Sequence, residues 1–379
     1  MIYLDNAATS WPKPEKVYRA MDTFFRELGA NPGRAGFRMA AEAEKVIRET
    51  RVLLKNLFNV PSPDHIIFTL NCTDALNIAL KGLLSPGDHV ITSCLEHNSV
   101  SRPLNRLAES GVEYSKIPHN QDGLIDPEEI KKMIRPETKL IVLAHASNVL
   151  GTLEPIREIG HLAAEHGIIF LLDAAQTAGA LPIDLKEMKI NLLACPGHKG
   201  LLGPTGTGVL VINDLEEIAS FREGGTGSLS GEPVQPSHFP DRLEAGTLNT
   251  VGIAGLKAGV EFIMEEGLEK IRRHELSLID LLLKGLSSIP GVTVYGTQRA
   301  EDRCGLVSFN IEGWEPQDVA AVLESKFDIA CRAGLHCAPW AHGFLGTLPY
   351  GAVRFSVGYF NTESEIKTAI EAVSALAGY

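Results

Sequence analysis

Between about residue 64 and residue 213, short apolar runs rich in β-branched residues alternate with amphipathic stretches of helical periodicity. The runs are nearly continuous in apolar character, which is typical of strands covered on both faces. Strands that alternate with helices in this way predict a mainly parallel sheet covered on both sides. The expected strands are 65–70, 89–93, 139–144, 168–172 and 208–213, and the expected helices are 74–83, one that begins at Asp126-Pro127, and 156–166.

The pattern changes after residue 250. A long helical stretch over 251–287 is followed by expected strands at 292–295, 306–310 and 352–355, and by an expected helix at 315–326. We predict a large domain over 14–250 and a small α+β domain over 251–379, with the segment 1–13 packing near the small one. The segment 223–240 is rich in Gly, Ser and Pro, and we expect a long ordered loop because site-like residues flank it.

Composition and charge exclude several classes of protein. The formal net charge is -12 and no long basic run occurs, so we expect no binding to nucleic acid. The apolar runs are too short to cross a bilayer, and the first residues lack the features of a signal peptide, so we expect a cytoplasmic chain that does not enter the membrane. The six cysteines show no CxxC pair and no zinc-like spacing, so we expect free thiols and no metal.

Two residues carry the strongest chemical signal. One apolar run is followed by Asp173, with Gln176 three residues further on, and a second run at 192–194 leads to Lys199 in a Gly-His-Lys turn. Pyridoxal phosphate (PLP) needs a lysine for its aldehyde carbon and a buried carboxylate for its ring nitrogen. Lys199 and Asp173 suit these roles, and Gln176 suits the ring oxygen. Alone, each would be an ordinary turn residue or surface charge.

Further polar residues follow other expected strands. Thr73 lies at an expected helix N-terminus, where free N–H groups suit a phosphate, although Thr73 could simply cap the helix. His97 follows the strand 89–93, at the kind of strand end where ligands bind, and could stack on a pyridine ring and exchange protons. Asn148 also follows a strand and could approach the ring oxygen.

A second motif, Arg332-Ala-Gly-Leu-His-Cys-Ala-Pro339, places Cys337 between Gly and Pro on an expected loop. Arg332 and His336 could both stabilise the thiolate, which is the nucleophilic form of a cysteine. Arg354 lies among apolar residues on an expected strand. Its charge requires a carboxylate partner, which is either a substrate or an internal Asp or Glu.

Over essentially its whole length the chain resembles the fold-type I PLP enzymes of the class V aminotransferase superfamily, in the cysteine desulfurase and selenocysteine lyase group. The segment around Cys337 is similar to the Suf-type form, in which the catalytic cysteine is on a short ordered loop. The resemblance implies a large domain with a mainly parallel seven-stranded sheet plus a smaller α+β domain. The matching segments are 3–9, 72–74, 96–98, 147–151, 173–176, 197–199, 244–250 and 332–338.

The resemblance also implies a role for each site residue. Lys199 would hold PLP and act as a base, Asp173 and Gln176 would bind the ring, and His97 would stack on it. Thr73, Cys72 and His198 would lie at the phosphate, which Thr247 would reach from the other subunit of a homodimer. Asn148, Arg354 and Arg332 would orient the substrate, and Cys337 would take the sulfur.

The implied reaction converts L-cysteine to L-alanine and leaves a persulfide for a sulfur-acceptor protein, as in iron–sulfur cluster assembly. Selenocysteine and cysteine sulfinate are alternative substrates. Another PLP reaction, such as epimerisation, transamination or a different lyase reaction, and a non-catalytic PLP-binding scaffold are the rival functions. The intact Lys199 and Cys337 favour desulfuration.

Three positions depart from the family pattern. Pro196 replaces the usual hydroxyl residue before Gly-His-Lys, and Cys72 replaces a Thr, so two phosphate donors are missing. We therefore expect weaker binding of PLP or a larger contribution from Thr247 and backbone groups. Gly33 precedes Arg34 where many Suf-type proteins have His.

Overall fold

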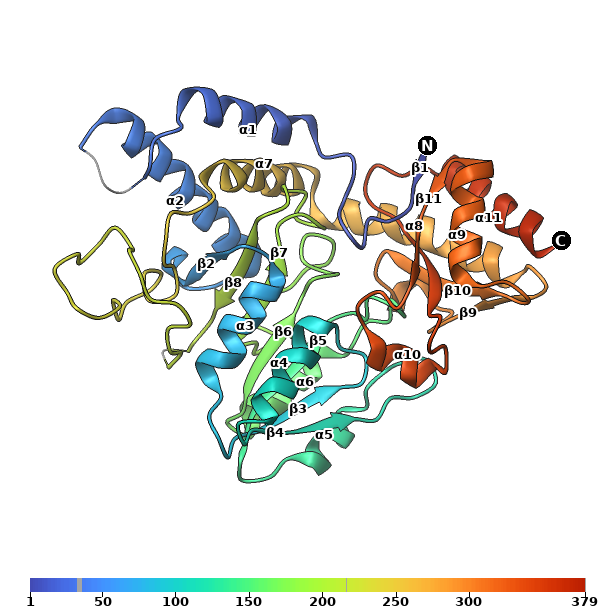
Figure 1. The fold of residues 1–379 in the computed structure, drawn as a ribbon, viewed down its shortest axis with the longest axis horizontal. Coiled ribbons are helices and arrows are strands. Elements are labelled where there is room, and N and C mark those ends of the chain that lie inside the picture. The colour runs from blue at the N-terminus through green and yellow to red at the C-terminus, as the bar shows by residue number, and fades with distance from the viewer. Residues whose placement is uncertain (33–35, 216, 379) are drawn as a thin grey trace.

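The computed structural model describes residues 1–379 except 33–35, 216 and 379. Its centre is a seven-stranded sheet in which β8 runs opposite to the other six strands. The predicted mainly parallel seven-stranded sheet is confirmed (Figure 1). In spatial order the strands are β2 (Ile66–Thr69), β8 (Gly208–Ile212), β7 (Leu192–Pro196), β6 (Ile169–Asp173), β5 (Thr138–Ala144), β3 (His89–Ser93) and β4 (Glu113–Ile117).

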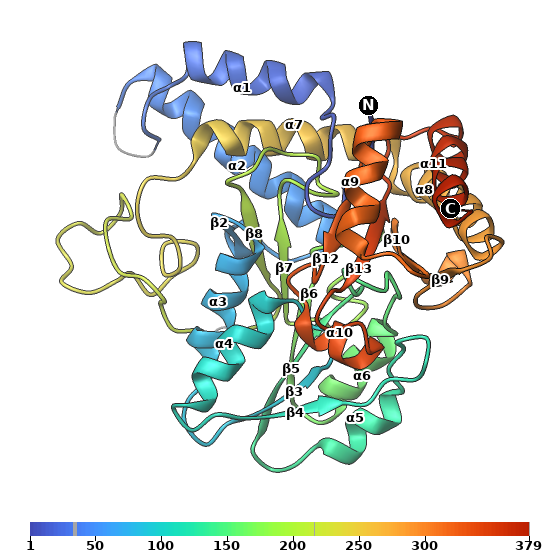
Figure 2. The same ribbon diagram turned by 45° about the vertical axis from the view of Figure 1, so that its right-hand side comes forward.

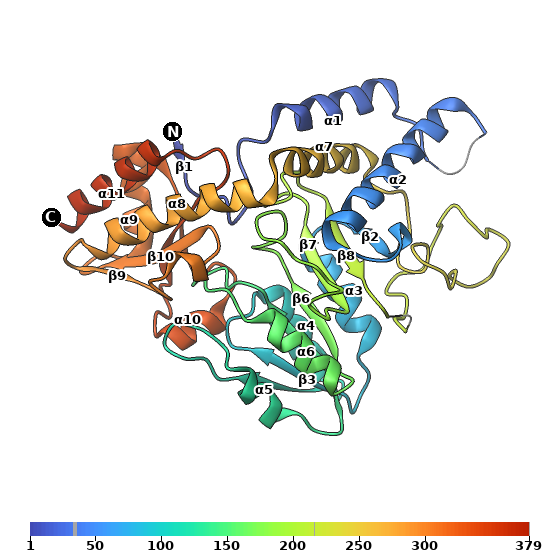
Figure 3. The same cartoon turned by 180° about the vertical axis from the view of Figure 1, so that it is seen from behind.

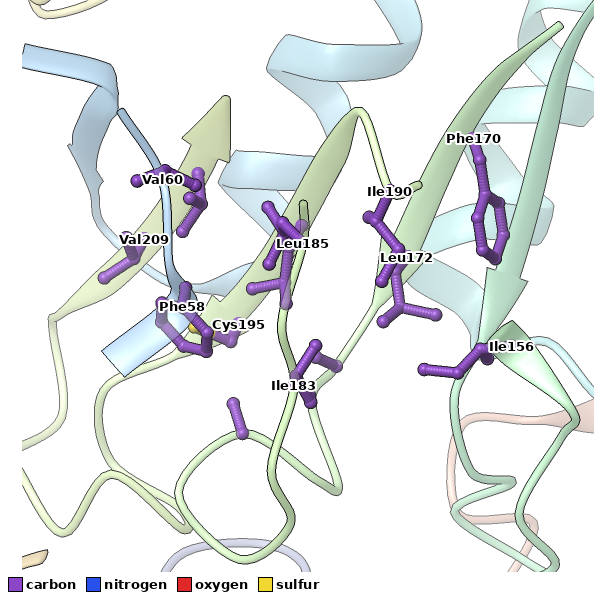
Figure 4. Packing of buried hydrophobic residues seen from close by; sticks show 14 of the residues in the cluster. Phe58, Val60, Ile156, Phe170, Leu172, Ile183, Leu185, Ile190, Cys195 and Val209 are labelled. Atoms are coloured by element: carbon purple, nitrogen blue, oxygen red, sulfur yellow. The ribbon is translucent and has the colours of Figure 1, made fainter. Parts of the chain in front are cut away.

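Helices cover both faces of this sheet because alternate strand residues are buried on opposite sides. Ile141 and Leu143 of β5 face one apolar cluster, whereas Leu140 and Val142 face the other. The helices α3 (Cys72–Leu83) and α4 (Asn98–Ala108) cover the second face. The first face is covered by α2 (Arg38–Phe58), α5 (Pro127–Met133), α6 (Ile156–Glu165) and α7 (Thr250–Glu266), of which α5 and α6 come forward in Figure 3. Figure 4 shows part of that core around Phe170 and Leu172.

A smaller antiparallel sheet lies beside the large one (Figures 1 and 2). Its strands, in spatial order, are β12 (Arg332–Gly334), β13 (Ala352–Ser356), β10 (Leu306–Ile311) and β9 (Val292–Val294). The helices α8 (Leu268–Ser287), α9 (Pro316–Phe327) and α11 (Glu363–Ala377) share its apolar core. The N-terminal strand β1 (Ile2–Tyr3) pairs with β11 (Ile329–Ala330), so the first residues pack on this smaller unit. The remaining helices are α1 (Glu15–Glu27), α10 (Pro339–Leu345) and the 3-10 turns η1 (Pro63–His65) and η2 (Ala300–Asp302).

The long helical stretch predicted over 251–287 is helical as expected, but it is divided into two helices, α7 and α8. Gly267 lies between them with φ 84, a conformation that glycine adopts without steric cost. The amphipathic pattern continues on both sides of this glycine, so periodicity alone does not reveal the break. α7 packs on α1 and α2 and contributes to the core of the large sheet, whereas the predicted boundary assigns it to the small domain. The domain division itself stays a prediction.

The segment from 213 to 249 contains no helix or strand among its described residues and projects beyond α2 and β2 (Figure 1). Gln235 ties it together internally, since its side chain accepts from Gly224 N–H at 3.0 Å and donates to the Asp241 carbonyl at 2.7 Å. Within the described part of the chain, no helix combines the length and the apolar character needed to cross a membrane.

Candidate active site

The carboxyl ends of β5, β6 and β7 open into a cavity of ≈ 230 Å³, which also reaches α3, α4, the N-terminal segment and the small sheet. Ligands of open α/β sheets bind at this edge. The structure brings ten of the twelve predicted site residues together here, and leaves Cys337 and Thr247 outside the lining. The ten are Cys72, Thr73, His97, Asn148, Asp173, Gln176, His198, Lys199, Arg332 and Arg354.

Asp173 and Lys199 are held by neighbouring parallel strands. Asp173 ends β6, where its Oδ1 accepts from Ala175 N–H at 2.9 Å and from the Cys72 thiol at 3.5 Å. Burial raises the pKa of Asp173, and the Ala175 hydrogen bond and the charge of Lys199 oppose that rise. Burial lowers the pKa of Lys199. The uncharged amine of Lys199 is therefore favoured more than in water, and a cationic ligand beside Asp173 would stabilise its carboxylate.

His97 is the N-cap residue of α4, and its Nδ1 accepts from Ser99 N–H at 3.0 Å. Burial and then the charge of Lys199 lower the pKa of His97 to about 4. The ring is therefore neutral near pH 7, and because Nδ1 accepts, its proton is on Nε2. A neutral imidazole at this position can stack on a flat ligand and exchange one proton.

The N-terminus of α3 faces the cavity. Its cap is Asn71, whose Oδ1 accepts from Asp74 N–H at 2.9 Å, so the alternative that Thr73 only caps the helix is wrong. Thr73 Oγ1 instead bonds to Ser99 Oγ at 2.6 Å. His198 Nδ1 is buried and has no hydrogen-bond partner among the described residues. An anion at this helix terminus would find a positive dipole end and a free imidazole nitrogen.

Arg354 reaches the cavity from β13 and is only 1% exposed. Its guanidinium donates to Asp5 Oδ1 at 2.8 Å and to the Asn148 carbonyl at 3.0 Å. Its carboxylate partner in this chain is therefore internal, while its Nε has no partner among the described residues. Asn148 in turn donates to the His336 carbonyl at 2.7 Å, which joins this part of the site to the segment that carries Cys337.

Cys337 is exposed on a turn just after β12. Arg332 lines the cavity, and one of its terminal nitrogens lies 4.0 Å from Cys337 Sγ. His336 does not supply a positive charge to the thiolate, so that prediction is wrong. Its Nε2 bonds to the Ala352 carbonyl at 2.9 Å, and burial and then the charge of Arg354 lower its pKa to about 2. The positive charge beside the thiol comes from Arg332.

Thr247 lies in a separate hollow of ≈ 440 Å³, together with Arg48, Arg51 and Glu244. Thr247 therefore does not reach a phosphate bound in the cavity of its own chain. Such a phosphate could be contacted only by the Thr247 of a second subunit. Pro196 ends β7 and lines the Lys199 cavity, where it has no N–H to donate. The departure at Gly33 and Arg34 lies outside the described residues.

Three contributors to the site were not predicted. Asp5 pairs with Arg354 across 349 positions of sequence, and Ser99 bonds to both His97 and Thr73. Lys13 donates to the His198 carbonyl and to Ser10 Oγ, each at 2.7 Å, and burial lowers its pKa to about 8. Asp5 lies in a segment that matches the family, but no local signal identifies its partner.

Comparisons with known proteins agree with this geometry. The family model described as aminotransferase class-V matches residues 2–368. A probable cysteine desulfurase of Methanothermobacter thermautotrophicus is 36% identical over 100% of this chain and 95% of its own length. A cysteine desulfurase of Escherichia coli O157:H7 is 33% identical over 100% of this chain and 94% of its own. The apo structure of a cysteine desulfurase from Thermococcus onnurineus NA1 superposes with a TM-score of 0.94 at 34% identity, covering 100% of this chain and 94% of that one.

Proposed function

Since the chain belongs to the class-V aminotransferase family, we propose that it is a PLP-dependent cysteine desulfurase that converts L-cysteine to L-alanine and captures the sulfur as a persulfide on Cys337. One observation carries the proposal. A half-buried lysine and a buried carboxylate share a cavity, and Arg332 of the same cavity lies 4.0 Å from an exposed thiol. A PLP enzyme without sulfur chemistry has no need for that thiol.

The residues of the cavity fit PLP. The Asp173 carboxylate would hold the ring nitrogen, Gln176 the ring oxygen and Lys199 the aldehyde carbon, with His97 against the ring. The phosphate would lie at the N-terminus of α3, near Thr73 and the free Nδ1 of His198. When bound, PLP supplies an aldehyde that takes up the substrate amino group and a ring that withdraws electrons from Cα.

The side chains of this protein perform the remaining steps. Arg354, through the Nε that its contact with Asp5 leaves without a partner among the described residues, holds the substrate carboxylate together with Asn148 and Arg332. The Lys199 amine takes the proton from Cα. The Cys337 thiolate, stabilised by Arg332, attacks the substrate sulfur. A sulfur–sulfur bond forms as the carbon–sulfur bond breaks, and the electron pair of the broken bond stays on Cβ, which takes a proton and becomes the methyl group of alanine. Lys199 then returns a proton to Cα. The persulfide then passes to an acceptor protein.

The proposal includes a homodimer in which Thr247 contacts the phosphate of the partner subunit. Two observations support it. Thr247 is outside the cavity of its own chain, and Pro196 and Cys72 leave that cavity with fewer phosphate donors. Closed two-fold dimers are also the commonest oligomers. The proposal also includes a cytoplasmic location, which the six free thiols favour, and iron–sulfur cluster assembly as the destination of the sulfur.

The test is a substrate panel of cysteine, selenocysteine and cysteine sulfinate, with alanine measured in the presence and absence of a thiol reductant. We expect alanine from cysteine together with one added sulfur on Cys337 in the mass spectrum. Alanine from selenocysteine or cysteine sulfinate alone would assign the chain to one of those reactions instead. Pyruvate or racemised product without a modified Cys337 would favour a lyase or an epimerase.

A further inference from the structure

Cys337 lies in a turn that the backbone does not adopt readily. His336 and Cys337 have φ of 48 and 57, so two consecutive residues other than glycine occupy the left-handed region. Such residues persist only where the surroundings hold them in place. Within the turn, the Ala338 N–H donates to the Leu335 carbonyl at 2.8 Å, and the Asn98 N–H donates to the Cys337 carbonyl at 2.7 Å.

The chain is fixed on the N-terminal side of the thiol by the two contacts of His336, with Ala352 of the small sheet and with Asn148. On the C-terminal side it enters α10, which has only seven residues and too few turns to be stable on its own. The contacts of α10 with its surroundings therefore decide how firmly that side of the turn is held.

The indole of Trp340, in the first turn of α10, connects this helix to the large sheet. It stacks on the ring of Tyr114, with centroids 5.8 Å apart and an angle of 27° between the planes. The Lys116 Nζ lies 4.3 Å from the centre of the indole. Tyr114 and Lys116 are two residues apart on β4, so they project from the same face of the edge strand. Figure 2 shows α10 between the small sheet and this β3–β4 edge.

We infer that Trp340 is a positioning residue for Cys337. Its stack on β4 keeps α10 docked on the large sheet, and α10 holds the C-terminal side of the strained turn, so the thiol stays at the mouth of the Lys199 cavity. The inference rests on the proposed function, because it assumes that Cys337 receives the sulfur. A purely structural role for Trp340 would instead affect every reaction of the enzyme equally.

The test compares two substrates in the holoenzyme. Trp340→Leu should lower alanine release from cysteine about tenfold, which is the scale of losing one stacked aromatic pair with its cation. Alanine release from selenocysteine, which we expect not to need the thiol, should change less than about twofold on the same scale. Trp340→Phe keeps a ring over Tyr114 and should recover most of the cysteine activity.

The matched control is Tyr350→Leu, since Tyr350 is an exposed aromatic residue of the segment that follows α10 and has no ring contact with another described residue. It should behave like wild type with both substrates. Tyr114→Leu removes the other half of the stack and should reproduce the selective loss, without further loss in the double variant. If Trp340→Leu does not fold, Tyr114→Leu takes its place in the test.

An equal fall with both substrates, or no fall with cysteine, would overturn the inference. The proposed function fails separately, if wild-type enzyme forms no persulfide on Cys337 or if Cys337→Ser keeps full activity on cysteine. Cys337→Ser and the Trp340 variants belong in the same panel. The activity of Cys337→Ser on cysteine is the lowest value expected, and the Trp340 variants are compared with it.

Discussion

The proposed function gives covalent roles to Lys199 and Cys337, and these two side chains lie in different surroundings. Lys199 follows a strand of the large sheet, is half-buried, and shares its cavity with Asp173. Cys337 is exposed on a turn between the small sheet and α10. A base whose pKa must fall needs to be shielded from water, whereas a thiol that receives sulfur and hands it on must be reached from outside.

The two groups are also held differently. β6 and β7 pair in parallel with Asp173 opposite Ala194, so the ordinary register of one sheet brings the Asp173 and Lys199 segments together. The Cys337 turn is held by contacts with Asn98, Asn148 and Ala352, which come from three separate segments. Substitutions around Lys199 should therefore affect all reactions, and those around Cys337 only the reactions that use the thiol.

The largest effect is expected for Lys199→Ala, which should abolish alanine formation from every substrate because both the cofactor anchor and the base are lost. Borohydride reduction should fix PLP on Lys199 in the wild type and leave no fixed cofactor in the variant, as measured by peptide mass spectrometry. Lys13 is the informative control, since burial lowers its pKa to about 8. Cofactor trapped on Lys13 in the wild type would contradict the assignment.

Cys337→Ser should abolish alanine release from cysteine and spare much of the activity on selenocysteine. Selenium leaves carbon more readily than sulfur, so the second reaction does not need a nucleophile to capture it. PLP binding, measured from its absorbance, should be unchanged. Cys331→Ser is the matched control, because burial raises the pKa of Cys331 to about 12 and keeps it a thiol. Sulfur found on Cys331 after turnover would argue against the mechanism.

Asp173→Asn keeps the shape of the side chain and removes its charge. We expect a fall of about 10²-fold or more in the rate with both substrates, since the ring nitrogen loses its counter-ion and the cofactor withdraws electrons less well. Rates with cysteine and selenocysteine should fall in parallel. A variant with near-normal turnover would rule out the role of Asp173. A fall with cysteine alone would contradict the expectation that substitutions around Lys199 affect all reactions.

Mixed dimers test the position of Thr247. In a dimer of one Lys199→Ala chain and one Thr247→Ala chain, contact across the interface places both defects in one site and leaves the other site intact. Such a dimer should therefore have about half of the wild-type activity, since only one of two equivalent sites is damaged. If Thr247 acted within its own chain, each site would carry one defect and the activity would fall well below half.

The smallest effect concerns stability on the Lys199 side. Glu275 is 8% exposed and lines a small cavity that Lys199 also borders, and burial raises its pKa from 4.5 to about 7. Below pH 4.5 the Glu275 carboxyl is protonated in both the folded and the unfolded states, so its burial does not lower the free energy of unfolding through charge. As the pH rises to 7 the unfolded state loses its proton first, and stability falls by about 3 kcal/mol.

Glu275→Gln removes this charge and should unfold at a higher temperature than wild type at pH 8, with little difference at pH 4.5. Thermal unfolding at the two pH values measures the effect, and Glu232→Gln, on an exposed loop, is the control that should change neither value. A variant that gains equally at both pH values would show that the charge of Glu275 is not the cause.

The strands of the large sheet could be predicted to within about two residues because burial on both faces leaves a local apolar signature. The strand expected at 168–172 lies at Ile169–Asp173, and the one expected at 89–93 is β3. β4 gave no such signal, since most of its residues are exposed or half-buried at the edge of the sheet. The helices α1 and α2 were not predicted either.

The sequence by itself determined that Lys199 and Asp173 meet at one edge of the large sheet, because each follows or ends an apolar strand and neighbouring strand ends converge in a parallel sheet. It also identified Cys337 as a loop thiol. Only the tertiary structure decided the partners: Asp5 for Arg354, a neutral His336, and Trp340 on β4. These contacts join segments far apart in the chain, and both their geometry and the burial that sets each charge depend on the folded packing, which no local pattern encodes.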